Sequence, residues 1–189
     1  MKKCSFFAKF IVVFMLVFSM ASAVLAIELN EVAPKMENAT RIANRGQDKI
    51  VPFGKYKWIK KDTGRWSLNL DTSNEYLFAS NGFFDVWSFT SDGKPDVAVY
   101  YFDNVGSLLT GWAKDDDGNY YFFDYVDGPS LGRMCSGWRK IGDAWYYFGP
   151  DGKLYVNEMT PDGFKVGIDG NLVNKNNSAS RYSKKYGSN

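Results

Sequence analysis

Residues 142–152 read GDAWYYFGPDG, and the dipeptide Gly137-Trp138 comes shortly before them. Side chains alternate between the two faces of a β-strand, so the four rings of residues 145–148 cannot all enter one core. Gly-Asp before the rings and Asp-Gly after them are typical turn residues. The stretch therefore predicts a strand of a β-hairpin with large rings on both faces, and each face must meet another surface.

The same pattern recurs in tandem. The tripeptide YYF begins at Tyr100, Tyr120 and Tyr146, and the second copy carries an insertion around Gly128-Pro129. The segments GWAKDDDGNYYF and GWRKIGDAWYYF each read as two short strands joined by an Asp-Gly or Gly-Asp turn. Because an isolated hairpin is only marginally stable in water, we expect the hairpins to stack and bury their rings.

Looser copies flank these repeats, and the sequence after residue 158 contains two Asp-Gly turns, which suits a capping unit. The predicted fold is mainly β: a solenoid of stacked β-hairpin repeats, preceded by a signal peptide and a flexible linker. Its expected parts are the signal peptide (1–26), a linker with one short helix at most (27–52), degenerate aromatic repeats (53–98), full repeats with a C-terminal capping unit (99–173) and a disordered tail (174–189).

The first 26 residues have the composition of a secretory signal peptide. Lys2 and Lys3 open the chain, an apolar run follows from Phe10, and small residues lead to a cleavage site after Ala26. An uncleaved membrane anchor is the alternative, because the apolar run is almost long enough to span a bilayer. The sequence predicts export, with no stable membrane span once the signal is cut.

Charge and residue types exclude several classes of function. The formal net charge is only +2, and the basic signal peptide contributes to it, so nucleic acid is not an expected partner. There is no histidine, which removes Ser-His and Cys-His catalytic pairs and nearly all zinc hydrolase sites. Cys135 is the one cysteine after the signal peptide, so no intrachain disulfide is expected. We expect no catalytic residues, no metal and no cofactor.

The segment GWRKIGDAWYYFGPDGKL resembles the choline-binding or cell-wall-binding repeat, which is also seen in glucan-binding proteins and in the oligosaccharide-binding tails of bacterial toxins. The match is strongest over residues 99–157. Two flanking pieces, WIKKDTGRW and TPDGFKVGIDGNLV, resemble sequences of secreted cell-wall-binding proteins of Gram-positive bacteria, which extends the resemblance to residues 56–173. The resemblance implies a left-handed superhelix with ligand pockets between successive hairpins. It also implies a location at the cell wall or cell surface, with teichoic acid or wall polysaccharide as the partner.

In choline-binding members of this family, rings of adjacent repeats form an open cage around a quaternary ammonium group. Such a group donates no hydrogen bond, so π faces and apolar contacts hold it, at about 0.5–2 kcal/mol for each ring. The resemblance assigns the best cage to Trp138 and Trp145, with Phe164 as the candidate for a third ring. Trp58 and Trp66 are candidates for a further cage. Several cages on one chain would give avidity for a polymer that repeats its ligand.

Trp112 and Tyr147 are assigned to the preceding cage, with one departure. Asn119 stands where the repeat usually has a tryptophan before YYF, which is expected to weaken or abolish cation binding there. In the copy that begins at Tyr100, Val99 likewise stands where the repeat usually has a tryptophan. The rings expected to form the core between hairpins are Tyr100, Tyr101, Tyr120, Tyr121, Phe122, Tyr146 and Phe148.

Other functions stay open, as does the oligomeric state. A carbohydrate binder would stack sugar rings on the tryptophans, with Asn119, Arg139 and Asp143 as polar partners. A protein ligand would suit exposed rings equally well. A catalytic part before residue 99 is disfavoured, because that stretch is short and a carboxylate-pair glycosidase needs a deep cleft. We therefore predict a non-catalytic, secreted binding module that attaches to the cell surface.

Overall fold

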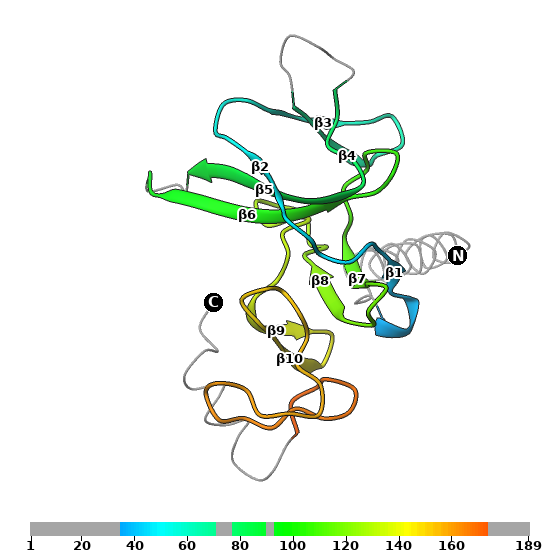
Figure 1. The fold of residues 1–189 in the computed structure, drawn as a ribbon, viewed down its shortest axis with the longest axis vertical. Helices are drawn as coiled ribbons and strands as arrows, with labels where there is room; N and C mark the ends of the chain where they lie inside the picture. Colours follow the sequence, from blue (N-terminus) through cyan, green and yellow to red (C-terminus); the bar gives the residue numbers. More distant parts are fainter. Residues whose placement is uncertain (1–34, 71–76, 90–92, 174–189) are drawn as a thin grey trace, which may run out of the picture. The chain divides into compact units, whose positions relative to one another are not determined.

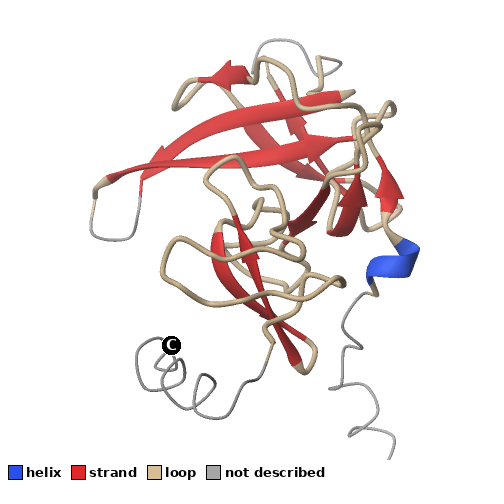
Figure 2. Ribbon diagram, turned by 60° about the horizontal axis from the view of Figure 1, so that its bottom comes forward, coloured by secondary structure: helices blue, strands red, loops and turns tan. Residues whose placement is uncertain are grey.

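The computed structural model describes residues 35–70, 77–89 and 93–173, which all belong to a compact unit that starts at Pro34. The predicted signal peptide and the predicted tail lie outside the described residues. Apart from one short 3-10 helix, the described chain consists of strands and loops (Figure 2). The elements are η1 (Met36–Asn38), β1 (Thr40–Arg41), β2 (Lys49–Val51), β3 (Lys57–Lys60), β4 (Trp66–Asn69), β5 (Gly82–Phe89), β6 (Pro95–Phe102), β7 (Gly111–Lys114), β8 (Tyr120–Phe123), β9 (Gly137–Ile141) and β10 (Ala144–Phe148).

Four antiparallel hairpins follow one another in the described part of the chain: β3–β4, β5–β6, β7–β8 and β9–β10 (Figure 1). The two hairpins predicted between each GW and the next YYF are β7–β8 and β9–β10. In the tighter of them, Gly142 and Asp143 alone connect the strands, and Gly142 has a φ of 59°. This left-handed conformation suits the two-residue hairpin turns whose twist matches that of the strands. The fold is therefore mainly β, as the sequence predicts.

The two faces of hairpin β5–β6 pack against different neighbours. On one face, Phe84 and Tyr100 share a hydrophobic cluster with Leu68 of β4. On the other face, Phe83 and Tyr101 lie in a second cluster with residues of β7 and β8. Rings on both faces of one strand are buried because this hairpin lies between two others.

The next two hairpins repeat this arrangement. Trp112 of β7 contacts Tyr146 and Phe148 of β10, with ring centroids 5.1 and 5.8 Å apart. The opposite face of β8 carries Tyr121 and Phe123 into the cluster shared with β5–β6. Most of the rings expected in the core are buried, and the others are half-buried. The buried ones are Tyr100, Tyr101, Tyr121, Phe122 and Phe148, whereas Tyr120 and Tyr146 are half-buried.

The segment before the hairpins differs from the expected linker. β1 pairs in parallel with β7, and β2 pairs in parallel with β5. Ile42 is only 3% exposed and packs with the rings of the second cluster. The partners of these short strands lie far along the chain, so a local pattern of charged residues gives no sign of the pairing. Within this segment, Met36–Asn38 form the 3-10 helix η1.

Candidate functional site

Three hairpins place the same two pairs of residues on one face. In the first pair, a tryptophan lies opposite an apolar or aromatic residue: Trp58 opposite Leu68, Trp112 opposite Phe122 and Trp138 opposite Tyr147. In the second pair, a lysine lies opposite an aromatic residue: Lys60 opposite Trp66, Lys114 opposite Tyr120 and Lys140 opposite Trp145. Because side chains alternate along a strand, both pairs of a hairpin share one face. The predicted ligand-binding tryptophans all lie on such faces.

This register corrects the alignment of the second repeat. Tyr120 occupies the position of Trp145, because each lies opposite a lysine. The backbone carbonyls of the two residues also accept equivalent hydrogen bonds. The N–H of Leu154 donates to the Tyr120 carbonyl at 2.8 Å, and the N–H of Leu172 donates to the Trp145 carbonyl at 2.7 Å. The position that the sequence alignment gives to Asn119 therefore carries an aromatic ring.

A longer turn explains the shift. Five residues (115–119) separate the lysine from its aromatic partner in β7–β8, whereas four (141–144) separate them in β9–β10. The additional residue is accommodated around the Asp115 carboxylate, which accepts hydrogen bonds from the backbone N–H of Asn119 at 2.8 Å and from its Nδ2 at 2.9 Å. The Asn119 side chain thus stabilises the turn.

The face of β3–β4 borders a cavity of about 410 Å³. Trp58, Trp66 and Tyr100 supply three aromatic side chains to it, and the Trp58 and Tyr100 rings lie 5.1 Å apart at 66°. Leu108 adds an aliphatic side chain. The opposite wall is the insertion of the second repeat, Asp127–Leu131, and the exposed Asp127 carboxylate is the charged group of the lining. The structure thus joins the predicted pair Trp58 and Trp66 to a third ring.

The face of β9–β10 meets the C-terminal unit at Phe164. The rings of Trp138 and Phe164 are perpendicular, with centroids 5.7 Å apart, and form a corner. The ring of Tyr147 also contacts Trp138, with centroids 5.3 Å apart. Trp145 lies on the same face by strand alternation. The Nε1–H of Trp138 donates to Asp162 Oδ2 at 2.9 Å, which fixes the indole and places a carboxylate at the edge of the cluster. The structure brings Trp138 and Phe164 together, as the sequence suggests.

The pair expected in the middle repeat is not brought together. Trp112 is 4% exposed and its ring packs on Phe122, Tyr146 and Phe148. Tyr147 points to the opposite face of β10, toward Trp138. Adjacent residues of a strand face opposite ways, so Tyr146 and not Tyr147 meets Trp112.

Polar groups near the aromatic faces have partners within the protein. Arg139 Nη2 lies 2.5 Å from the buried Asp124 carboxylate, on the face of β9 opposite to Trp138. Asn119 is likewise bonded to Asp115, so neither Arg139 nor Asn119 is available beside the tryptophans to bind sugar hydroxyls.

The cysteine of the described chain is not a reactive group. Burial raises the pKa of the Cys135 thiol to about 12, which keeps this cysteine neutral and unreactive at ordinary pH.

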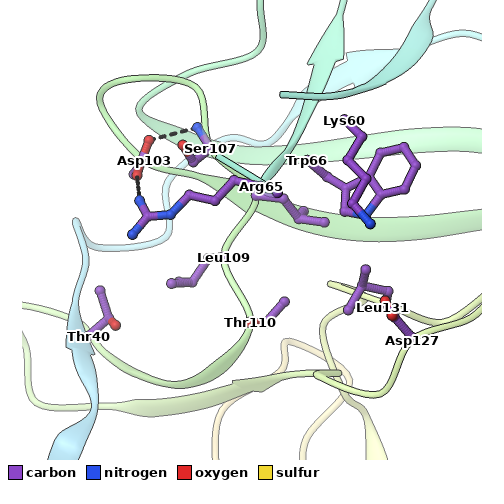
Figure 3. A pocket seen from close by; sticks show the side chains of 12 residues that line it. Thr40, Lys60, Arg65, Trp66, Asp103, Ser107, Leu109, Thr110, Asp127 and Leu131 are labelled. Atoms are coloured by element: carbon purple, nitrogen blue, oxygen red, sulfur yellow. Dashed lines mark hydrogen bonds and ion pairs between the residues drawn. The ribbon is translucent and has the colours of Figure 1, made fainter. Parts of the chain in front are cut away.

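A second, larger cavity of about 500 Å³ adjoins the first (Figure 3). Both are lined by Trp66, Leu108, Asp127 and Leu131. The larger cavity alone is lined by the side chains of Lys60, Arg65, Asp103, Thr110 and Thr40. Lys60 Nζ lies 5.6 Å from the centre of the Trp66 ring.

Sequence reasoning missed three contributors to the aromatic cavity, Tyr100, Leu108 and the insertion 127–131, and it did not foresee the larger cavity. Tyr100 was expected in the core, and it is buried, yet its ring also borders the aromatic cavity. The insertion was visible as a departure from the repeat, which is the signal that could have found it. Its position opposite Trp66 depends on contacts between hairpins that the sequence does not display.

The described ranges contain neither a metal-binding cluster nor a membrane-spanning helix. No group of three or more Asp, Glu, Cys or His side chains there is placed to hold a metal ion. None of the helices in those ranges is long and apolar enough to cross a membrane.

Comparison with known proteins identifies the repeats. Residues 110–125 and 136–154 match the family model described as "putative cell wall binding repeat". No curated protein matches the chain. Similar solved structures include CbpJ from Streptococcus pneumoniae, with 21% identity over 67% of this chain and 41% of its own, and a TM-score of 0.40. The choline binding domain of Spr1274 from S. pneumoniae has 29% identity over 47% of this chain and 93% of its own, with a TM-score of 0.35.

The multimodular pneumococcal cell wall endolysin from phage Cp-1, complexed with choline, has 22% identity over 71% of this chain and 41% of its own, with a TM-score of 0.40. The chain thus spans about two fifths of the length of CbpJ and of this endolysin. The matched segments contain hairpins β7–β8 and β9–β10, where the repeated GW and YYF motifs lie. Residues 110–125 and 136–154 are therefore two copies of a segment that is similar to the cell wall binding repeat.

Proposed function

We propose that this protein is a non-catalytic, exported module that holds choline-type quaternary ammonium groups of a wall polymer such as teichoic acid. The aromatic cavity at Trp58, Trp66 and Tyr100 is the observation that carries the proposal. Three ring systems and an aliphatic side chain surround a space with few hydrogen-bonding groups. This composition suits a cation that donates no hydrogen bond, since ring faces and apolar contacts are what bind it.

The corner at Trp138, Trp145 and Phe164 is the equivalent position toward the C-terminal end of the repeats. Leu108 and Leu172 donate equivalent backbone hydrogen bonds to Trp66 and Trp145, at 2.8 and 2.7 Å, which supports the comparison. The Asp162 carboxylate beside Trp138 would add electrostatic attraction to a cation. We infer two ammonium sites, and two sites on one chain increase avidity for a polymer that repeats the group.

A glycan is less well suited to these two aromatic sites. Sugar binding requires hydrogen-bonding side chains beside the rings, and two of the expected ones, Asn119 and Arg139, are bonded to Asp115 and Asp124. The proposal also retains residues 1–26 as an export signal.

The test is a titration of the purified protein with choline and with 3,3-dimethyl-1-butanol, followed by tryptophan fluorescence. The second compound has nearly the same shape, with carbon in place of the charged nitrogen. We expect saturable quenching by choline in the millimolar range and weaker binding of the neutral compound. Loss of one ring at one site, in Trp66→Leu or Phe164→Leu, should weaken binding at that site by roughly 2- to 30-fold.

Trp87→Leu is the matched control, because Trp87 is 44% exposed and lines neither of the two cavities. It should leave choline affinity unchanged. Equal binding of the two compounds would contradict recognition of the cation. Unchanged choline affinity in the Trp66→Leu, Phe164→Leu double variant would contradict the location of both sites.

A further inference from the structure

The larger cavity beside the aromatic one has a different chemical character. Its side chains come from four separate parts of the chain: strand β1, the β3–β4 hairpin, the segment that follows β6, and the insertion of the second repeat. Figure 3 shows Thr40, Thr110 and Leu131 on one side and Lys60 with Trp66 on the other. A volume of about 500 Å³ lies within the range of small-molecule sites, so it can hold a ligand of its own.

The charges of this cavity balance. Lys60 and Arg65 contribute two positive groups, and Asp103 and Asp127 contribute two negative ones. Arg65 Nη1 lies 3.9 Å from Asp103 Oδ2, which brings one opposite pair together inside the cavity. A cavity with no net charge has no general preference for an anion or a cation, which favours a neutral ligand.

The position of Lys60 separates this cavity from the ammonium site. Its ammonium group lies over the Trp66 ring, and Lys60 lines the larger cavity but not the smaller one. A ligand cation on this side of Trp66 would meet a like charge. A neutral ligand would instead gain a hydrogen-bond donor from Lys60.

The Asp103 carboxylate already accepts hydrogen bonds from the protein backbone. It accepts hydrogen bonds from the backbone N–H of Ser107 at 2.7 Å and of Val105 at 3.0 Å. The exposed hydroxyls of Thr40 and Thr110, together with Lys60 and Asp127, are then the groups that face a ligand. Hydroxyls both donate and accept, which suits a ligand that is itself rich in hydroxyl groups.

Leucine side chains complete the lining. Leu108, Leu109 and Leu131 line the same cavity as these polar groups and Trp66. A ligand that complements both the polar groups and the leucine side chains of the cavity has hydroxyls, an apolar C–H face and a methyl group. A pyranose ring that carries an acetamido group has all three.

We propose that this cavity binds an N-acetylated sugar residue of the same wall polymer or of the neighbouring glycan. The inference extends the proposed ammonium site without depending on it, since the two cavities share one wall but Lys60, Thr40 and Thr110 line the larger cavity alone. Because Trp66 and Asp127 line both, a sugar and an ammonium group can be held side by side.

The test uses N,N′-diacetylchitobiose as the probe and cellobiose as its matched control, since the two disaccharides differ in their acetamido groups. Binding to the purified protein is measured from protein amide shifts in two-dimensional NMR, with and without saturating choline. We expect saturable binding of diacetylchitobiose in both conditions and at least fivefold weaker binding of cellobiose. Shifts should be centred on residues of the larger cavity.

Thr110→Val removes a hydroxyl and keeps the shape of the side chain, so one lost hydrogen bond should weaken diacetylchitobiose binding about two- to tenfold. Thr63→Val is the control, because Thr63 is exposed and lines neither of the two cavities. Lys60→Met is a second variant and should also weaken sugar binding. Neither Thr110→Val nor Thr63→Val should change choline affinity.

Three results would overturn the inference: no saturable binding of diacetylchitobiose, equal binding of cellobiose, or equal affinity in Thr110→Val, Lys60→Met and the wild type. Failure of the ammonium proposal is a separate result, because it is read from choline binding. Sugar binding without choline binding would support this inference and contradict that proposal.

Discussion

Trp58, Trp112 and Trp138 occupy equivalent positions in three hairpins, yet their surroundings differ. Trp112 is covered by Tyr146 and Phe148 of the next hairpin and is almost completely buried. Trp58 and Trp138 remain half-buried. The same residue type therefore contributes to the core in one repeat and to a candidate ligand site in another, and what packs on it decides which.

A single carboxylate gives the clearest prediction at this scale. Asp85 Oδ1 is buried and has no hydrogen-bond partner, and Asp48 lies close to it, paired with Arg45. Burial raises the pKa of Asp85, a hydrogen bond to Asp48 and its negative charge raise it further, and Arg45 acts in the opposite direction. A carboxyl whose pKa is higher in the folded state favours folding at low pH, and this contribution is lost as the pH rises through that raised pKa.

Asp85→Asn removes the titration and nearly keeps the shape. We expect the variant to gain stability relative to the wild type as the pH rises from 4 to 7.5, and to be the more stable of the two at pH 7.5. Urea unfolding at several pH values measures this difference. A difference that does not change with pH would show that Asp85 titrates as it does in the unfolded chain.

At the scale of the elements, turn glycines set how closely successive units stack. Gly132 has a φ of 75°, and a Cβ placed on it would lie 2.5 Å from Leu108 Cδ2. The same close approach recurs at Gly170, which has a φ of 74°. A Cβ placed on Gly170 would lie 2.6 Å from Leu154 Cδ2. Glycine is needed at these positions both for the left-handed conformation and for the close approach.

Gly132→Ala tests this relation, with Gly54→Ala as the control. Gly54 has nearly the same φ, 73°, but nothing lies within 4 Å of the position that a Cβ would take there. Backbone strain alone should cost about 1–3 kcal/mol in each variant. Gly132→Ala should lose more stability in urea unfolding, because Leu108 must move. Equal losses would mean that the turn conformation, and not stacking, selects glycine here.

At the scale of the whole described unit, the segment before the hairpins connects two sheets. β1 extends the sheet of β7–β8, and β2 extends the sheet of β5–β6 (Figure 1). Arg45, between these strands, donates to the Asp151 carbonyl at 2.6 Å and lies 5.4 Å from the centre of the Phe83 ring. The segment thus contacts two hairpins, β5–β6 and β7–β8, and the turn that follows β10.

Ile42→Ala tests whether this segment is part of the folded core. Ile42 is 3% exposed within a cluster of buried rings, so its truncation should lower the free energy of unfolding by about 2–5 kcal/mol in urea. Ile50→Ala is the control in the same segment, because Ile50 is 70% exposed and should lose little. Equal, small losses in both variants would restore the view of this segment as a linker.

The local motifs were sufficient to predict the hairpins and the rings on both of their faces. Asp-Gly and Gly-Asp turns between runs of aromatic residues specify strands over a short distance, and a strand with large rings on both faces requires neighbours on both sides. The family resemblance had offered Trp58 with Trp66, and Phe164 as a candidate ring beside Trp138, and the structure brings the members of each pair close together. The register of the second repeat did not follow from the motifs, because one more turn residue moves Tyr120 to the position where YYF alignment expects Asn119.

The sequence by itself determined that this chain forms a stack of β-hairpins with tryptophans at repeated positions, since both features depend on short-range alternation and turn chemistry. Tertiary structure alone decided which tryptophans are covered, where the N-terminal segment pairs, and that the insertion 127–131 faces Trp66. These properties depend on contacts between residues far apart along the chain. Such contacts depend on how each unit packs on the next, and no motif within one repeat encodes that.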